Sequence, residues 1–220
     1  TDQNNVRYAG GRVMHTDDPD KQLSITALAE IVHREKDALP AVWSNGLQAQ
    51  ASYDPPSSPV TSATHIVTVE VDSCTGAVHL CRYVVAEDCG PMIDEGVVEG
   101  QVRGAIAQAI GGTLYEEVQY SAEGQLLTGT LQDYLVPSIF DVPRIEIVHL
   151  CTPSPLTEGG YKGVAEGGTI GAPAAIVNAI ADALGVLPDQ VRLPLTPERV
   201  LALIDADKAD PLQGSVSTRA

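Results

Sequence analysis

The chain has 220 residues, of which 44% are hydrophobic, and its 13 basic and 29 acidic residues give a formal net charge of −16. This length and apolar content allow one large domain or two small ones with a buried core, which argues against disorder. The negative charge would repel phosphate backbones and anionic headgroups, so we expect neither nucleic acid nor a membrane as a partner. No apolar run approaches a membrane span, and the first residues do not resemble a signal peptide.

The cysteines and histidines show no metal-binding pattern. Four cysteines are scattered without a CxxC pair, so the sequence predicts neither a disulfide framework nor a zinc or iron–sulfur ligand set. Three histidines in or beside strand candidates lack a second ligand-type residue at metal spacing, and we predict no metal ligands. A reducing cytoplasm fits this cysteine usage. The residues concerned are Cys74, Cys81, Cys89, Cys151, His65, His79 and His149.

The N-terminal segment, residues 1–59, is expected to contain one helix and an extended loop. Residues 24–38 place apolar side chains at helical spacing behind Ser24, whose hydroxyl can cap the first turn. Residues 44–62 are rich in serine, proline and glutamine without sustained periodicity, which is typical of a surface loop.

The region 60–205 mixes strand and helix patterns. Residues 66–72 and 77–85 are strand-like and are joined by a short turn, which predicts an antiparallel hairpin. Residues 95–118 carry the longest helical pattern, and residues 145–150 are a further strand candidate. The apolar stripe of that helix comprises Val98, Val102, Ile106, Ile110 and Leu114. The fold class is therefore α+β, with antiparallel strands and packed helices.

The same helix carries small residues at three- and four-residue spacing. Glycine costs about 1 kcal/mol relative to alanine inside a helix, so repeated glycines indicate a packing or binding reason. Close helix packing and proximity to a cofactor are equally consistent with the pattern. Its members are Gly100, Gly104, Ala107 and Gly111.

A glycine-dense stretch, residues 159–171, leads into the apolar residues 173–184, which are expected to form a buried helix. Residues 196–204 predict a last helix, with threonine as its cap and proline at its first position. Residues 206–220 form a polar tail that is expected to fray.

Glu166 is the only carboxylate between Glu158 and Asp182. Burial would raise its pKa and suit it to proton abstraction, whereas the alternative is a solvated loop glutamate. A glycine-rich loop before a helix also has the general form of a phosphate site. Neither GxGxxG nor GxxxxGK[ST] occurs in this stretch, which weighs against an unrelated phosphate-binding enzyme.

Five motifs occur one after another along the chain. They are Gly100–Gln108, Leu114–Glu117, Gly124–Thr130 with Asp133-Tyr134, Thr152–Pro155, and Lys162–Pro173 followed by Asn178-Ala179. In this order they resemble the signature of the molybdopterin-binding subunit of the xanthine oxidase and aerobic carbon monoxide dehydrogenase family. The resemblance covers about residues 60–185, in what would be the C-terminal part of that subunit. Asp94-Glu95 departs from the family's asparagine–proline.

This resemblance implies a role for each matching residue. Glu166 corresponds to the general base, which removes a proton so that a water-derived oxygen attacks the substrate carbon. Gln101, beside Gly100, corresponds to the glutamine that hydrogen-bonds the pterin, and an amide both donates and accepts. The small Gly167 and Gly168 would leave room beside the metal. The segment expected to wrap around the pterin comprises Thr128, Gly129, Thr130 and Asp133.

The resemblance also implies cofactors and partners. We expect a molybdopterin-type molybdenum cofactor with a sulfido ligand, and [2Fe–2S] clusters and FAD on other subunits or domains. The N-terminal part of the same subunit would complete the pocket, and the chain would be inactive without it. The small-molecule substrate is open among aldehydes, N-heterocycles, purines and carbon monoxide. The alternative is a non-catalytic fragment or assembly module that keeps the fold without bound cofactor.

Overall fold

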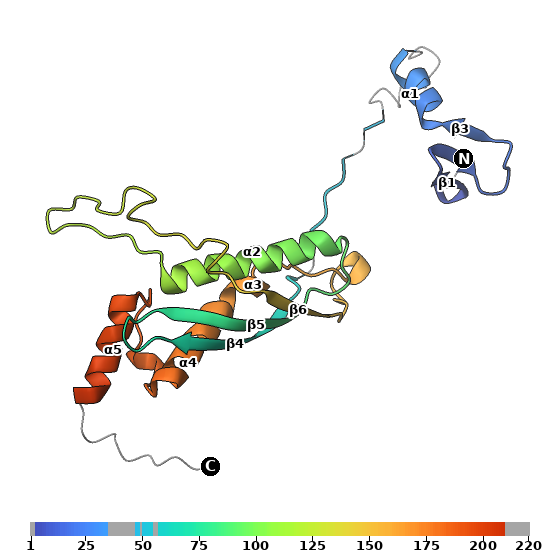
Figure 1. Cartoon of the computed structure of the whole chain (residues 1–220). Coiled ribbons are helices and arrows are strands. Elements are labelled where there is room, and N and C mark those ends of the chain that lie inside the picture. The colour runs from blue at the N-terminus through green and yellow to red at the C-terminus, as the bar shows by residue number, and fades with distance from the viewer. Residues whose placement is uncertain (1–2, 35–46, 49, 55–56, 210–220) are drawn as a thin grey trace. The chain divides into compact units, whose positions relative to one another are not determined.

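The computed structural model describes residues 3–34, 47–48, 50–54 and 57–209, and the chain divides into two compact units, Thr1–Asp54 and Pro55–Ala220 (Figure 1). The end of the helix expected over 24–38, parts of the loop expected over 44–62 and most of the expected tail lie outside the described residues.

The first unit is a small antiparallel sheet followed by a helix. After a 3₁₀ turn at Gln3–Asn5, strands β1 (Val6–Ala9), β2 (Arg12–His15) and β3 (Gln22–Ser24) pair in that order, and α1 spans Ile25–Arg34. The Ser24 hydroxyl accepts a hydrogen bond from the Ala27 amide at 3.0 Å, which confirms the predicted cap. The sheet itself was not predicted, because strands of three or four residues are too short to reveal an alternating pattern.

The second unit contains a three-stranded sheet in the order β4-β5-β6. Strands β4 (Ser62–Val71) and β5 (Val78–Asp88) form the predicted antiparallel hairpin, which is longer than the sequence indicated. Strand β6 (Ile145–Leu150) pairs with β5 in parallel, so within this sheet the expectation of antiparallel strands holds only for the β4–β5 pair. Parallel pairing requires the long crossover that residues 89–144 provide.

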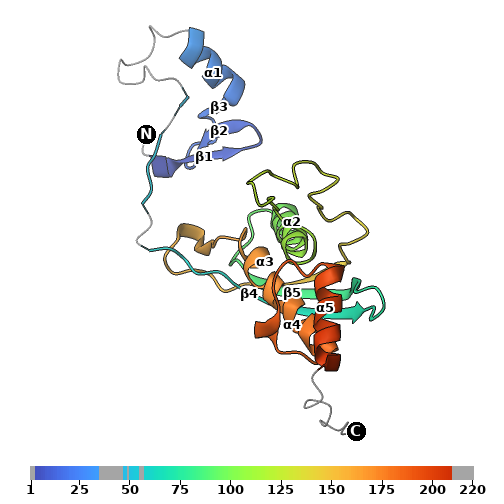
Figure 2. The ribbon, with the colours of Figure 1, turned by 90° about the vertical axis from the view of Figure 1, so that its left-hand side faces the viewer.

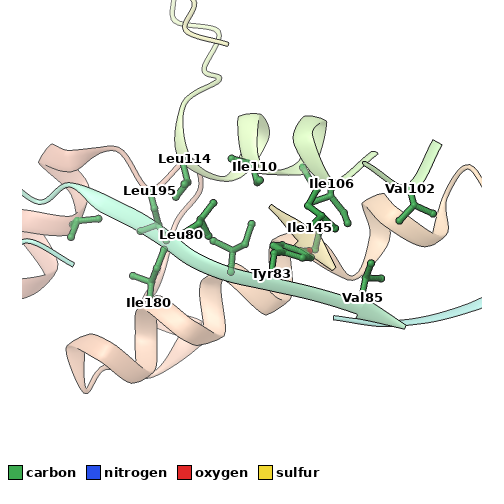
Figure 3. Packing of buried hydrophobic residues seen from close by; sticks show 14 residues of the cluster. Leu80, Tyr83, Val85, Val102, Ile106, Ile110, Leu114, Ile145, Ile180 and Leu195 are labelled. Carbon is green, nitrogen blue, oxygen red and sulfur yellow. The ribbon is translucent and has the colours of Figure 1, made fainter. Parts of the chain in front are cut away.

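Helix α2 (Glu95–Leu114) covers the buried face of this sheet, and all five residues of its predicted apolar stripe are buried. Figure 3 shows Tyr83 and Val85 of β5 beside Ile106 of α2. The helix was predicted to continue to residue 118. It ends at Leu114 because the amides of Tyr115 and Glu116 both donate to the Gly111 carbonyl, at 2.9 and 2.8 Å, which closes the last turn.

Residues 115–144 connect α2 to β6 as an excursion that projects beyond the C-terminal end of α2 (Figures 1 and 2). A turn at its centre is closed by the Ser121 amide, which donates to the Gln125 carbonyl at 2.8 Å. Large apolar side chains of the excursion are exposed, and Phe140 retains 90% of its accessible surface. The others include Val118, Tyr120, Leu127, Leu131, Leu135, Val136 and Ile139.

The C-terminal third supplies the remaining helices: α3 (Gly167–Ile170), α4 (Ala172–Leu184) and α5 (Pro197–Ala209), with 3₁₀ turns at Glu158–Gly160 and Pro188–Gln190. Helix α4 contacts β4 and α2. It was expected to be buried, but only one face is, because Ala174, Asn178 and Asp182 are exposed. Helix α5 continues to Ala209, past the predicted end at residue 204.

Residues Gly167–Leu184 are long and apolar enough to cross a membrane by length and composition alone. The sequence analysis had found no apolar run of that length. This stretch consists of two helices that meet at Gly171, and Ala172, Ile176 and Ile180 are fully buried in the core. These residues belong to the 28% of the stretch that is buried in the second unit.

The core predicts a large effect of truncation at Ile106, which is fully buried. We expect Ile106→Ala to lower the free energy of unfolding by about 2–5 kcal/mol, because it removes buried contacts and leaves a cavity. Denaturant unfolding of the chain measures this change. Val97→Ala, at a position that is 60% exposed on the same helix, is the control and should change stability by less than about 0.5 kcal/mol.

Candidate functional site

Glu166 immediately precedes the four-residue helix α3 and has helical backbone angles, φ −88° and ψ −18°. Its carbonyl accepts hydrogen bonds from the amides of Thr169 and Ile170 at 3.0 and 3.1 Å. The side chain is exposed, and its carboxylate has no hydrogen-bond or ion-pair partner within the described part of the chain. The burial that the sequence suggested is therefore not supplied by this chain. The Glu166 carboxylate is accessible at the surface of the second unit.

The segment that carries Glu166 is held at its beginning by a buried ion pair. Lys162 Nζ lies 3.1 Å from Asp88 Oδ1, and the two side chains are 10% and 8% exposed. The Lys162 amide also donates to the Cys89 carbonyl at 3.0 Å. Asp88 Oδ1 accepts further hydrogen bonds from the amides of Gly90 and Thr152, both at 3.0 Å. These bonds fix the entry of the segment to the end of β5.

The same segment is held at α3 by His65 of β4. The His65 ring lies between Tyr83 and α3, with Nδ1 2.9 Å from the Tyr83 hydroxyl and Nε2 2.9 Å from the Gly167 carbonyl. The pKa of His65 is lowered, because its burial outweighs the opposing effect of the hydrogen bond to Gly167. The sequence had suggested only that His65 lies in a strand. Its role in joining β4 to the Glu166 segment was missed, because Gly167 is 102 positions away.

Helix α3 packs tightly against α2 at Gly168. A side-chain carbon at this buried glycine would lie 2.7 Å from Ala105 Cβ and 2.8 Å from the Val102 carbonyl oxygen. The requirement for glycine at 168 is therefore explained by helix packing. At Gly167, an added carbon would meet only Ala63 Cβ at 3.7 Å, which leaves that position open.

The contact at Gly168 places α3 against the part of α2 that carries Gln101. Gln101 and Ala105 are one turn apart on one face of the helix, and Ala105 contacts Gly168. Gln101 is exposed, and a side-chain carbon added at Gly100 or Gly104 would meet nothing within 4 Å. An exposed amide thus lies beside open helix backbone, which fits a polar, planar ligand such as a pterin.

The small residues of α2 therefore serve two purposes. Gly111 is buried at the end of the helix, where an added carbon would lie 2.9 Å from Pro137 Cδ. Gly100 and Gly104 face open space. Close packing accounts for the first glycine, whereas the other two remain available to a ligand.

The residues expected to wrap around the pterin lie in the excursion that follows α2 (Figure 1). Their contacts are local: the Thr130 hydroxyl donates to Asp133 Oδ2 at 2.8 Å, and Thr128 Oγ1 accepts from the Gln119 amide at 3.0 Å. No contact joins Thr128, Gly129, Thr130 or Asp133 to Glu166 or Gln101 among the interactions of the described residues.

A further polar cluster lies at the ends of β5 and β6. His149 Nδ1 lies 2.5 Å from Glu87 Oε1, and the Cys89 thiol lies 3.7 Å from the same oxygen. Burial, followed by the nearby Glu87 charge, raises the pKa of Cys89, so the thiol stays protonated.

An apolar hollow of about 360 Å³ lies between the start of α2 and the segment that leads to Glu166. Val98 of α2 and Val164 of the segment both line it. The other lining residues are Cys89, Pro91, Met92, Ile93, Asp94, Val97, Tyr161 and Lys162.

Comparison with known proteins identifies the family. Residues 1–143 match the family described as "Molybdopterin cofactor-binding domain". The chain belongs to the molybdopterin-binding subunit family of xanthine oxidase and carbon monoxide dehydrogenase. The family match includes Gln101 and the excursion and ends before Glu166.

Large subunits of two known enzymes are similar to most of the chain. The nicotine 6-hydroxylase large subunit of Paenarthrobacter nicotinovorans is 37% identical over 183 residues, which are 83% of this chain and 22% of the relative. The carbon monoxide dehydrogenase large chain of Hydrogenophaga pseudoflava is 32% identical over 156 residues, 71% of this chain and 19% of the relative. The chain thus spans about a fifth of the length of these relatives.

Solved structures of the family have the same fold. Quinoline 2-oxidoreductase from Pseudomonas putida 86 superposes with a TM-score of 0.75 at 41% identity, covering 92% of this chain and 26% of that structure's chain. A Cu,Mo-carbon monoxide dehydrogenase superposes with a TM-score of 0.72 at 25% identity, covering 92% and 25%. These likenesses confirm the α+β fold of a molybdopterin-binding subunit.

The Asp88–Lys162 pair predicts a specific loss of stability in acid. Hydrogen bonds from Thr152, then Gly90 and Lys162, hold the pKa of Asp88 well below its ordinary 3.8. Because the folded state lowers this pKa, the stabilisation is present above about pH 4 and is lost as pH falls through the folded-state pKa. We expect Asp88→Asn to unfold at a lower temperature at neutral pH and to lose less additional stability in acid than the unsubstituted chain. Thermal unfolding across this pH range measures both effects.

The control for this prediction is Asp182→Asn, at an exposed position on α4. This variant should follow the unsubstituted chain at every pH. An Asp88→Asn variant with the same acid dependence as that chain would contradict the assigned role of the ion pair.

The two adjacent glycines of α3 predict different responses to alanine. Gly168→Ala should cost about 1–3 kcal/mol, because its methyl group would be forced against α2. Gly167→Ala should be close to neutral, because its methyl group meets only an ordinary contact. Denaturant unfolding of the two variants measures the difference. Equal stabilities would show that the contact at Gly168 does not hold α3 in place.

Proposed function

We propose that the chain is the C-terminal part of the catalytic subunit of a molybdenum hydroxylase, with Glu166 as its general base. The observation that carries the proposal is the arrangement around α2. Helix α3 presents an unpartnered, exposed carboxylate, and it packs against the part of α2 where Gln101 lies beside open backbone. The chain belongs to a family that binds a molybdopterin cofactor, and this arrangement would hold that cofactor.

Each residue would perform one task in this reaction. Gln101 would donate and accept hydrogen bonds at the pterin edge, and Gly100 and Gly104 would let the ligand approach the helix backbone. The chemistry that the molybdenum cofactor supplies when bound is a two-electron oxidation. The Glu166 carboxylate would accept a proton from the water-derived oxygen as that oxygen attacks the substrate carbon. Exclusion of solvent from Glu166 would come from the remainder of the subunit.

We propose an N-heteroaromatic ring as the substrate class. Support comes from the names of similar proteins, because nicotine 6-hydroxylase and quinoline 2-oxidoreductase share 37% and 41% identity with the chain. The carbon monoxide dehydrogenases share 25–32%. A ring carbon beside a nitrogen is electrophilic, which suits attack by an oxygen nucleophile that a carboxylate has deprotonated. Purines are N-heteroaromatic rings and belong to this class, so aldehydes and carbon monoxide are the competing substrates in a direct comparison of turnover.

We further propose that the chain functions within a larger assembly. The partners would be the N-terminal part of the same subunit, together with iron–sulfur and flavin subunits or domains that carry the electrons away. One relative is named as subunit gamma of a dehydrogenase complex. In such an assembly, a partner would cover the exposed apolar side chains of the excursion 115–144.

Substitution of Glu166 tests the proposed base. In the complete enzyme, Glu166→Gln should reduce turnover per bound molybdenum by at least about 100-fold, because the amide cannot accept the proton. The molybdenum content should be unchanged, because no metal ligand is lost. Steady-state kinetics and metal analysis measure both quantities.

The matched control is Glu158→Gln, at an exposed glutamate immediately before the glycine-dense stretch. It should leave turnover unaffected. Full turnover in Glu166→Gln would remove Glu166 from the mechanism. Loss of molybdenum together with turnover would reassign it to cofactor retention.

A further inference from the structure

The His65 ring uses both of its nitrogens to join two parts of the second unit. Nδ1 lies 2.9 Å from the Tyr83 hydroxyl, and Nε2 lies 2.9 Å from the Gly167 carbonyl oxygen. The ring also fills the space beside Gly171, where an added side-chain carbon would lie 2.6 Å from His65 Cδ2. The imidazole is therefore enclosed by β5 on one side and by the two ends of α3 on the other.

These contacts determine which tautomer of His65 is present. The Gly167 carbonyl can only accept a hydrogen bond, so Nε2 must carry a proton. The lowered pKa of His65 favours the neutral ring, so Nδ1 is an acceptor and the Tyr83 hydroxyl donates to it. Tyr83 is fully buried, and its ring meets the His65 ring edge to face with centroids 5.9 Å apart. The chain of hydrogen bonds runs in one direction, from Tyr83 through His65 to Gly167.

The position of the Gly167 carbonyl affects the orientation of Glu166. Gly167 directly follows Glu166, and α3 is a single turn that could not maintain its geometry alone. The Glu166 carbonyl accepts from Thr169 and Ile170, so a rotation of α3 would also move the backbone from which the Glu166 carboxylate projects. The Nε2–H of His65, whose ring is held by the buried Tyr83, fixes the rotation of α3.

We propose that His65 is a positioning residue for the general base, acting by donation from Nε2–H to the Gly167 carbonyl. The proposal rests on the proposed function of Glu166. It assigns to the strand β4 an indirect part in catalysis, through the contact of His65 with the backbone of α3. Misplacement of a catalytic group by about 1 Å is enough to slow a reaction by about 100-fold.

Two amide substitutions separate the donor from the acceptor function of His65. Glutamine at this position places an N–H near the location of Nε2 and retains donation to Gly167. Asparagine places an oxygen near the location of Nδ1 and retains only the bond from Tyr83. In the complete enzyme, His65→Asn should lower kcat per bound molybdenum by about 10- to 100-fold with KM unchanged. His65→Gln should restore kcat to within a few-fold of the unsubstituted enzyme.

Hydrogen exchange gives a readout independent of turnover. The amides of Thr169 and Ile170 donate to the Glu166 carbonyl, so their protection reports the geometry of α3. Both amides should exchange faster in His65→Asn and at the normal rate in His65→Gln, with or without cofactor. Exchange in β1–β3 of the first unit should be identical in all variants.

Three outcomes would overturn the proposal. The first is normal kcat and normal exchange in His65→Asn. The second is equal loss in both amide variants, which would mean that the imidazole only fills space. The third is loss of molybdenum with normal turnover by the remaining loaded enzyme, which would make the role structural. Failure of the proposed function is distinguished by Glu166→Gln, which would then remain active whatever the His65 variants do.

Discussion

The buried side chain of Tyr83 connects the hydrophobic core to the candidate site. Its ring is fully buried in the cluster that β5 shares with α2 and α4, and its hydroxyl meets His65. A buried hydroxyl without a partner costs about 1–3 kcal/mol, so the core determines where that hydrogen bond must be made. The position of the Glu166 segment therefore follows from apolar packing several side chains away.

A glycine-rich segment with one turn of helix is a weak structure by itself, because a short helix gains few hydrogen bonds for the entropy it loses. Three external contacts compensate: the Asp88–Lys162 ion pair, the His65 ring and the packing of Gly168 on α2. The ion pair is buried, and Asp88 accepts further hydrogen bonds that offset the cost of desolvation. The glycines permit close approach, and the side chains of other elements supply the rigidity.

Sequence patterns predicted the elements that are long or strongly periodic. The β4–β5 hairpin and the apolar stripe of α2 were predicted because their periods extend over many residues. The sheet of β1–β3 and the parallel pairing of β6 were not, because the strands are short and pairing depends on the path of the whole crossover. Glu166 was predicted as the base from the ordered motifs, and that role stays a prediction. His65 was missed because its partners are 18 and 102 positions away and leave no local pattern.

The contacts that hold the Glu166 segment also determine when it can form. Lys162 and Gly167 meet partners 74 and 102 positions earlier in the chain, so each contact closes a long loop and carries its entropic cost. The hairpin and α2 involve nearer neighbours and can form first. Folding of the second unit would thus end at the Glu166 segment, and a nascent chain would order that segment only after β4, β5 and α2 are in place.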